Sequence, residues 1–492
     1  MNKTAKGILI GAGVLVLLSG ALVALKLTEP ESGTSSGSTL SSEDTNSTLL
    51  WEVDESTVKS IAVTYGGDSY TVVPTDPTQD EDGNTIFNYT LENAEGLNVD
   101  TVTLRTVASR AVSITTVNTV EEHATDLAQY GLDKPRASVT LTLEDGTVKA
   151  FSVGDASPLS SQTYFALKGE TTVYTVASDK LSPFLKQEGD YLNKAIVPER
   201  AEDDNTILSE ILIQRKDLDY DIRLKYDSFY AEMENGGTTA THIMTEPVPC
   251  NISPERGSKI TVGMYGLTAS GVVKLHPTEA DLATYGLQDP FCTMTVTSDA
   301  GVTQTLKIGN TFQLEGDDTT YYYGYYDGVD VVYSFTAETA PCISVMPRDI
   351  SSGLVFTTYV WDIGKLTVEA KDRETMAFVG SGTSKEDYQV QLNGKDADSE
   401  RYRQFYVFLL KTAAEDLCLN GEKPTGELLA KITLERQDGL KTQTVSFYEA
   451  ENRKVYIEVD GVCAFMCRRS FVDTLFKNMD MYDTDEEFIL NW

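Results

Sequence analysis

The chain carries nearly the same ten residues twice. DLAQYGLDKP occupies residues 126–135 and DLATYGLQDP occupies residues 281–290, 155 positions later. In each copy Tyr is followed by Gly and Leu, and Pro comes three residues after the Leu. This order is typical of a helix end, where Gly takes the left-handed conformation, the next apolar residue packs back and Pro prevents continuation. The motif consists of Tyr130, Gly131, Leu132 and Pro135, and of Tyr285, Gly286, Leu287 and Pro290.

A structural role is favoured for this motif, which we call the YGL motif, because capping explains its Gly, Leu and Pro without a ligand. The alternative is that the Tyr and the Asp of each copy hold a ligand or a proton. The helices that end at the two motifs are expected to start near Thr119 and Thr278, each with an acidic residue three positions later, although the first could equally start later.

Similar hairpin patterns follow both motifs. The turns are expected at Asp145-Gly146 and Ala300-Gly301, and a Gly at 154 and at 309 keeps the same offset. A third, degenerate copy without the YGL motif is expected around the turn at Asp438-Gly439. The predicted units are residues 50–197, 198–350 and 351–492, each with antiparallel β-hairpins and short helices, which is an α+β class.

The N-terminal region predicts a membrane anchor. Residues 7–25 contain no charged side chain, and a helix of this length is about 28 Å long, close to the thickness of the bilayer hydrocarbon. Lys3 and Lys6 on the short side favour a cytoplasmic N-terminus. Residues 1–27 are therefore interpreted as cytoplasmic tip and transmembrane helix, and residues 28–49 as a flexible Ser/Thr-rich stalk that carries an extracytoplasmic body. A cleaved signal peptide is the competing interpretation.

These features together resemble the bacterial family called domain of unknown function 4340. The resemblance is carried by Asp126–Pro135, Gly154-Asp155 and Val173-Tyr174, and by Asp281–Pro290, Gly309-Asn310 and Val332-Tyr333. It implies a single-pass, membrane-anchored extracytoplasmic protein, and in some members an association with ABC-type transporters. It supplies no catalytic residues.

Composition excludes some function classes. The chain has 75 Asp and Glu against 40 Lys and Arg, a net charge of −35, which opposes nucleic-acid binding. The three His form no metal-binding motif, so no metal or cofactor is expected. The acidic loop at residues 76–84 leaves weak calcium binding as a minor alternative. The six Cys permit disulfides outside the cell, although Cys463 and Cys467 are about 13 Å apart on a strand, too far to bridge each other.

The most unusual local composition is YYYGYYDG at residues 321–328. Strand geometry places alternate tyrosines on opposite faces, one of them expected to be core. The candidate binding patch is Tyr321, Tyr322, Tyr323, Tyr325 and Tyr326.

The sequence therefore predicts a non-enzymatic, membrane-anchored interaction or accessory protein with a protein partner in the cell envelope, such as an ABC-type transport system. The alternatives are a module that binds cell-wall glycan through the tyrosines, and a hydrolase with a carboxylate site that sequence spacing does not reveal.

Overall fold

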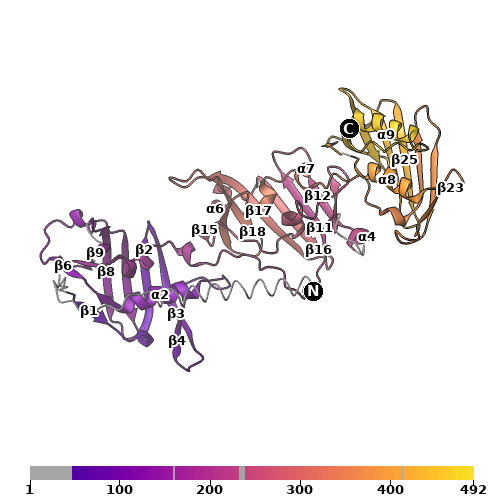
Figure 1. Cartoon of the computed structure of the whole chain (residues 1–492). Helices are drawn as coiled ribbons and strands as arrows, with labels where there is room; N and C mark the ends of the chain where they lie inside the picture. The colour runs from indigo at the N-terminus through magenta and orange to yellow at the C-terminus, as the bar shows by residue number, and fades with distance from the viewer. Residues whose placement is uncertain (1–46, 159–160, 232–238, 413) are drawn as a thin grey trace, which may run out of the picture.

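Three large antiparallel sheets follow one another along the molecule in chain order (Figure 1). The computed structural model describes residues 47–158, 161–231, 239–412 and 414–492. The first sheet has eight strands, the second and third have nine each, and a separate two-stranded sheet pairs β1 (Leu49–Glu52) with β5 (Ser113–Thr115).

The three sheets use 26 strands. The first sheet contains β2 (Val58–Tyr65), β3 (Asp68–Gln79), β4 (Thr85–Leu91), β6 (Asn118–Glu121), β7 (Ala137–Leu143), β8 (Val148–Ala156), β9 (Gln162–Leu167) and β10 (Val173–Ala177). The second contains β11 (Leu208–Arg215), β12 (Ile222–Tyr226), β13 (His242–Glu246), β14 (Cys250–Asn251), β15 (Gly271–Leu275), β16 (Cys292–Ser298), β17 (Thr303–Phe312), β18 (Tyr321–Tyr326) and β19 (Val331–Phe335). The third contains β20 (Ile363–Ala370), β21 (Met376–Ser381), β22 (Gln389–Leu392), β23 (Lys395–Ala397), β24 (Asp416–Leu417), β25 (Leu428–Arg436), β26 (Thr442–Glu449), β27 (Lys454–Val459) and β28 (Val462–Arg468).

The strand order is equivalent in all three sheets. In the first sheet the order is β4-β3-β2-β7-β8-β9-β10-β6, in the second it is β14-β13-β12-β11-β16-β17-β18-β19-β15, and the third follows the second strand for strand. Each sheet therefore joins two meanders through their first strands, and a strand from the connecting segment closes the far edge. The joining pairs are β2 with β7, β11 with β16, and β20 with β25.

The predicted α+β class is wrong, because the structure is mostly β, with 41% strand and 18% helix. The longest helices of the described residues have 12 residues each. The helices are α2 (Thr101–Val112), α3 (Ser178–Leu181), α4 (Ser228–Ala231), α5 (Ser258–Thr261), α6 (Glu279–Thr284), α7 (Pro347–Ile350), α8 (Ser399–Leu410) and α9 (Arg469–Asp480). The helix expected to start at Thr119 is absent: Thr119 lies in β6, where its β-branched side chain suits a strand.

The fold prediction also includes a transmembrane helix at residues 7–25. In the part of the chain that the structure describes, no helix is long and apolar enough to cross a membrane. Residues 7–25, for which the span is predicted, lie outside that part.

Both YGL motifs end a helical turn in the same way. The first turn is a 3-10 helix, Ala128–Tyr130, and the second is α6, which begins with a capping box between Thr278 and Asp281. Gly131 and Gly286 have φ values of 66° and 73°. In the second copy the Gly286 N–H donates to Ala283 O and the Leu287 N–H donates to Leu282 O, and the first copy has the equivalent bonds. This is the hydrogen-bond pattern of a Schellman helix end.

Each helix end then packs against a bulge in the following hairpin. The β17–β18 register shifts between Ile308 and Thr311, which places Gly309 in the bulge. A Cβ atom on Gly309 would lie 2.1 Å from Tyr285 O, and one on Gly154 would lie 2.3 Å from Tyr130 O. The Asn310 N–H donates to Tyr285 O at 2.8 Å. The two parts of the family resemblance, the YGL motif and the Gly-Asp or Gly-Asn pair, therefore contact each other.

The third sheet lacks both partners of this contact. No YGL motif precedes β25, and β26 pairs with β27 in one continuous register from Val445 to Glu449. The bulge is thus present in the sheets that have the helix end and absent from the one that does not.

Gly309→Ala should lower the free energy of unfolding by at least about 3 kcal/mol, because the new methyl group would force the Tyr285 backbone away. Gly301→Ala is the control, since Gly301 has a φ of 77° but nothing within 4 Å of a Cβ. It should cost only about 1–2 kcal/mol through backbone strain. Urea denaturation of both variants measures the difference, and equal losses would contradict the close contact.

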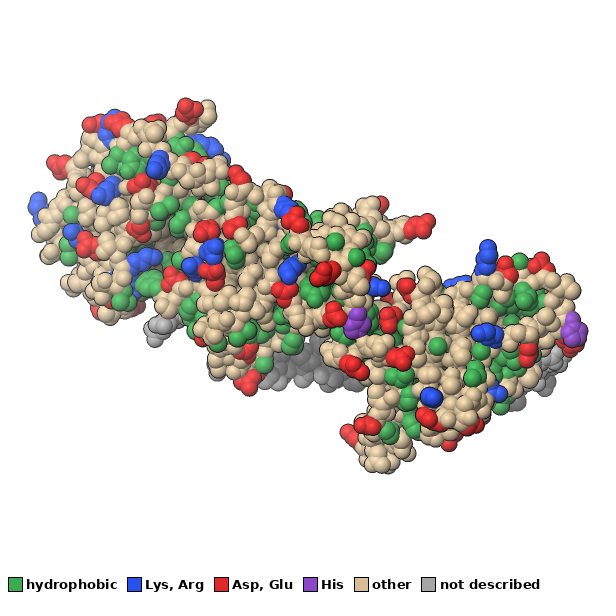
Figure 2. All heavy atoms as spheres, turned by 180° about the vertical axis from the view of Figure 1, so that it is seen from behind, with side chains coloured by type: hydrophobic (Ala, Val, Ile, Leu, Met, Phe, Trp, Pro, Cys, Tyr) green, Lys and Arg blue, Asp and Glu red, His purple; other side chains and the backbone are tan. Residues whose placement is uncertain are grey.

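The first and second sheets share one continuous cluster of buried apolar side chains, and the third sheet has a second cluster of its own. At the surface, acidic and basic side chains are spread over the face in Figure 2 rather than gathered in one patch. The excess of acidic residues therefore acts on this face as a dispersed charge.

His276, which follows β15, joins the first two sheets through polar contacts. Its Nδ1 lies 2.7 Å from an Asp330 carboxylate oxygen, and its Nε2 contacts the backbone oxygen of Asn93, which follows β4 of the first sheet. The hydrogen bond with Asp330, followed by the one to Asn93, raises the pKa of His276. Both ring nitrogens face acceptors, so the charged imidazolium is the form that satisfies the site.

A histidine whose pKa is raised by folding stabilises the fold below its unfolded pKa, and this contribution is lost as pH rises through the folded pKa. Glu188 is the other charged group that raises the pKa of His276. Asp330→Asn should therefore lower the unfolding midpoint more at pH 6 than at pH 8.5. Denaturation of both proteins over this pH range measures the effect, and a difference independent of pH would refute it.

Candidate functional site

The tyrosine-rich stretch forms strand β18, and its side chains divide between two faces. Tyr322 and Tyr326 pack against the shared apolar cluster of the first two sheets. Tyr321, Tyr323 and Tyr325 are half-buried and belong to the alternate positions. The five predicted residues therefore do not form one patch, because strand geometry separates them.

On the second face the rings form an aromatic row. Phe312 stacks on Tyr321 at 5.5 Å and on Tyr323 at 4.4 Å between ring centroids. Tyr323 also contacts Tyr285 of the YGL motif at 4.5 Å. The first sheet has a related pair, Tyr130 with Tyr164 at 5.0 Å. The tyrosine of each YGL motif thus packs on the hairpin that follows it, which is a structural use of its ring.

A mostly apolar pocket lies instead in the third sheet, beside α8. This α8 pocket has a volume of about 480 Å³. Its apolar walls are Leu354, Phe356, Tyr359, Trp361, Val407 and Leu410, and its charged residues are Lys385, Glu400 and Arg403. A concave, mostly apolar surface with a few polar groups is the usual form of a binding site.

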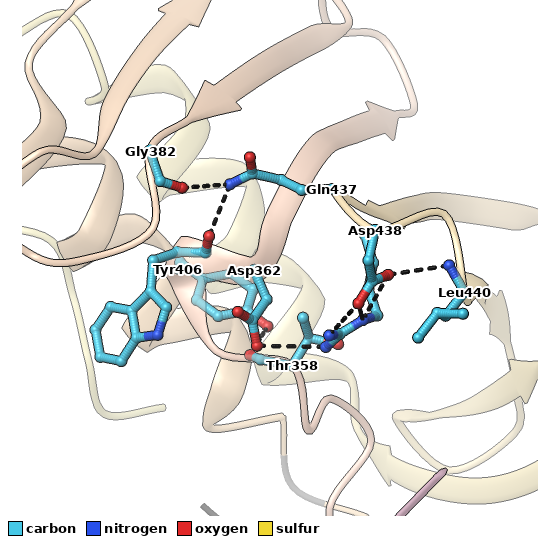
Figure 3. Close-up of polar contacts among 9 residues, drawn as sticks. Thr358, Asp362, Gly382, Tyr406, Gln437, Asp438 and Leu440 are labelled. Carbon is cyan, nitrogen blue, oxygen red and sulfur yellow. Dashed lines mark hydrogen bonds and ion pairs between the residues drawn. The ribbon is translucent and has the colours of Figure 1, made fainter. Parts of the chain in front are cut away.

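One wall is the segment before β20, and side chains of the third sheet hold it in place. The Tyr406 hydroxyl, which is buried on α8, donates to Thr358 O at 2.7 Å. Gln437 Nε2, from the β25–β26 turn, donates to Trp361 O at 2.7 Å and to Gly382 O at 2.8 Å (Figure 3). The rings of Tyr359 and Trp361 are parallel within 1°, with centroids 5.6 Å apart. The segment therefore presents an ordered aromatic pair to the pocket.

A charged cluster anchors the end of the same segment. Arg436 Nη1 lies 3.3 Å from Asp362 Oδ2, and its other nitrogens contact Asp438, whose carboxylate also accepts from the Leu440 N–H (Figure 3). Hydrogen bonding with Arg436 lowers the pKa of Asp438. The Arg436 guanidinium also lies 5.3 Å from the Phe229 ring of α4. These contacts connect the pocket wall to the second sheet.

Two of the residues that line the pocket, Lys385 and Arg403, are cationic. Arg403 forms an ion pair with Glu400 one helical turn away, and its Nε is buried without a hydrogen-bond partner among the described residues. Lys385 is exposed and makes no ion pair with any residue the structure describes. The Arg403 side chain is 19% exposed in all, so its accessible guanidinium atoms can meet a hydrogen-bond acceptor in the pocket. The pocket can therefore take an apolar group next to a hydrogen-bond acceptor.

The comparisons with known proteins assign part of the chain. Residues 89–235 match the family model for Domain of unknown function (DUF4340). The predicted family resemblance is confirmed over this range. The comparisons with curated proteins and with solved structures found no match.

The DUF4340 match covers most of the first sheet, including its YGL motif and Gly154-Asp155, and ends near α4. The second copy of these motifs and the α8 pocket lie outside the matched residues. The family description therefore says nothing about the pocket.

The remaining candidate from the sequence is the acidic loop at residues 76–84, considered for calcium binding. Within the described ranges, no group of three His, Cys, Asp or Glu side chains is arranged to hold a metal ion. In the acidic loop, the Asp80 carboxylate accepts hydrogen bonds from the Asp82 and Asn84 backbones and from the Asn84 side chain. That carboxylate therefore stabilises its own turn. Weak calcium binding stays a prediction.

The α8 pocket is not among the sites predicted from the sequence, although the sequence contains a signal for it. Glu400, Arg403, Gln404 and Lys411 mark one helical face of residues 399–411 as polar. Val407 falls on this face and is 42% exposed. An apolar residue at the centre of a polar helical face indicates a surface that another group can cover.

Tyr406→Phe should lower the free energy of unfolding by about 1–2 kcal/mol, because Thr358 O would lose its buried donor. Tyr482→Phe is the matched control. The Tyr482 hydroxyl is buried without a partner among the described residues, so its removal should be neutral or stabilising. Chemical denaturation followed by tryptophan fluorescence measures both, and equal effects would contradict the role of the Tyr406 hydrogen bond.

Proposed function

We propose that the protein is a non-enzymatic interaction protein of the cell envelope, and that its α8 pocket receives an apolar side chain from a protein partner. The observation that carries the proposal is the composition of the pocket: apolar and aromatic walls beside the partly exposed guanidinium of Arg403. An apolar anchor next to a backbone carbonyl or a carboxylate of the partner would complement both features.

The aromatic pair supports a protein partner. Binding energy at protein interfaces concentrates on a few residues, with Trp, Tyr and Arg enriched among them. Trp361, Tyr359 and Arg403 supply these three types around one pocket. The Thr358 and Gln437 contacts hold the pocket wall in place before binding, which reduces the entropy lost when a partner docks.

The location of this protein is proposed on the sequence. The uncharged run at residues 7–25 supports a position at the membrane, with the body of the chain outside the cytoplasm. The family resemblance supports an envelope transport assembly of the ABC type as the partner class, in which the chain is an accessory subunit.

A second candidate, binding of cell-wall glycan, is favoured by the aromatic row on β18. Against it, Tyr323 already contacts Phe312 and Tyr285, so its ring contributes to packing within the protein. A glycan function would require binding of the full chain to wall polysaccharide and weaker binding after Tyr323→Ala with Tyr325→Ala. Absence of binding by the unmutated chain would eliminate this candidate.

Val407→Asp should abolish partner binding, because it places a charge in the centre of the apolar pocket. Val379→Asp is the control, since Val379 is 49% exposed on β21 of the same sheet. The full chain is purified from its own cells in mild detergent, and associated proteins are quantified by mass spectrometry. We expect envelope transporter subunits with the unmutated chain and with Val379→Asp, and at least a tenfold loss with Val407→Asp.

Two other outcomes separate the parts of this proposal. Recovery of the chain alone in several mild detergents would contradict the accessory function. Equal recovery of the partner with both variants would support an interaction protein but remove the α8 pocket as its binding site.

A further inference from the structure

Two buried cysteines lie side by side at the closing edge of the third sheet. Cys418 directly follows β24, and Cys463 is the second residue of β28. Their sulfur atoms are 3.4 Å apart, and the residues are 1% and 6% exposed. All six cysteines of the chain are thiols in the structure. A sulfur–sulfur contact of this length brings two reactive atoms together within one sheet.

The backbone fixes this arrangement. β24 pairs antiparallel with β28, and the Cys418 N–H donates to Ala464 O at 3.0 Å. The pairing continues beyond the two residues of β24, so Cys418 lies across from Ala464 in β28. The backbone of Cys418 is therefore held beside the residue that follows Cys463.

We propose that Cys418 and Cys463 form a disulfide bond in the protein outside the cytoplasm. The sulfurs must approach by about 1.4 Å to reach the length of a disulfide. Because β24 has only two residues and lies within the segment that connects α8 to β25, a small side-chain rotation with a shift of this edge can supply the movement.

The reaction needs a disulfide oxidant, either a small-molecule disulfide or the disulfide of an oxidoreductase. One Cys thiolate attacks a sulfur of the oxidant and releases one thiol, and the second Cys thiolate then attacks the mixed disulfide and releases the other thiol. The two cysteines lose two protons and two electrons, and the oxidant becomes two thiols. Hydrogen bonding with Cys418 lowers the pKa of Cys463, which favours Cys463 as the first nucleophile.

A disulfide here would stabilise the closing edge of the third sheet, which has a short strand. The equivalent closing strands of the other sheets, β6 and β15, have four and five residues, whereas β24 has two. Neither β6 nor β15 contains a cysteine. A bond between Cys418 and Cys463 would compensate for the short ladder and close a loop around β25, β26 and β27.

The test is a peptide map of the full chain after exposure to oxidised glutathione. The protein is alkylated under denaturing conditions and digested with trypsin. Cys418 falls in the peptide 412–431, because the Lys423-Pro424 bond resists cleavage, and Cys463 falls in 455–468 together with Cys467. We expect these two peptides to be linked with the loss of two hydrogens, and fragment ions to place the link on Cys463.

Variants make the assignment independent of fragmentation. Cys467→Ser should keep the link, and Cys463→Ser should lose it. The two variants are matched, because both positions are buried on the same strand. Dithiothreitol should release the two peptides from the unmutated chain. Full alkylation of Cys418 and Cys463 after oxidation, or a link through Cys467, would overturn the proposal. Both outcomes can be measured on the unmutated protein, so the test does not depend on whether a variant folds.

Discussion

Each sheet depends on one long-range pairing between the first strands of two meanders. β2 pairs with β7, β11 with β16 and β20 with β25, in antiparallel registers that extend over seven or more residue positions. Inward-facing apolar residues of these strands are fully buried, for example Ile61, Ile211 and Leu366. Without this pairing, each half would be a meander with an open edge and one uncovered apolar face.

Local features of the sequence predict the hairpins better than the class of the fold. The Gly residues at the expected turns, Gly146 and Gly301, have positive φ, as a tight turn requires. The predicted α+β class is wrong because the strands outweigh the helices and because one segment predicted as helical forms a strand. Residues around Thr119 and Val120 pair with β10 instead, and this pairing depends on a strand more than 50 residues away. Long-range partners of this kind are not visible in local periodicity.

The β18 tyrosines and the α8 pocket differ in how far the sequence predicts them. The composition of β18 predicts a tyrosine binding patch, but in the structure Tyr323 contacts the rings of Phe312 and Tyr285. The α8 pocket depends on three segments that meet only in the folded chain: the strand-entry segment at Trp361, the loop at Lys385 and the outer face of α8. Of these, only Val407 on a polar helical face carried a signal in the sequence.

The coupling between the YGL helix end and the glycine bulge has a consequence for how the three sheets can vary. In the first two sheets a backbone oxygen occupies the space where a side chain would otherwise stand, so neither partner can change alone. The third sheet has neither partner and keeps the same strand order. In the third sheet, α8, the segment before β20 and the closing strand β24 are therefore not constrained by this contact. These elements form the α8 pocket and bring Cys418 close to Cys463. The copy with the fewest shared motifs has the greatest room for a function of its own.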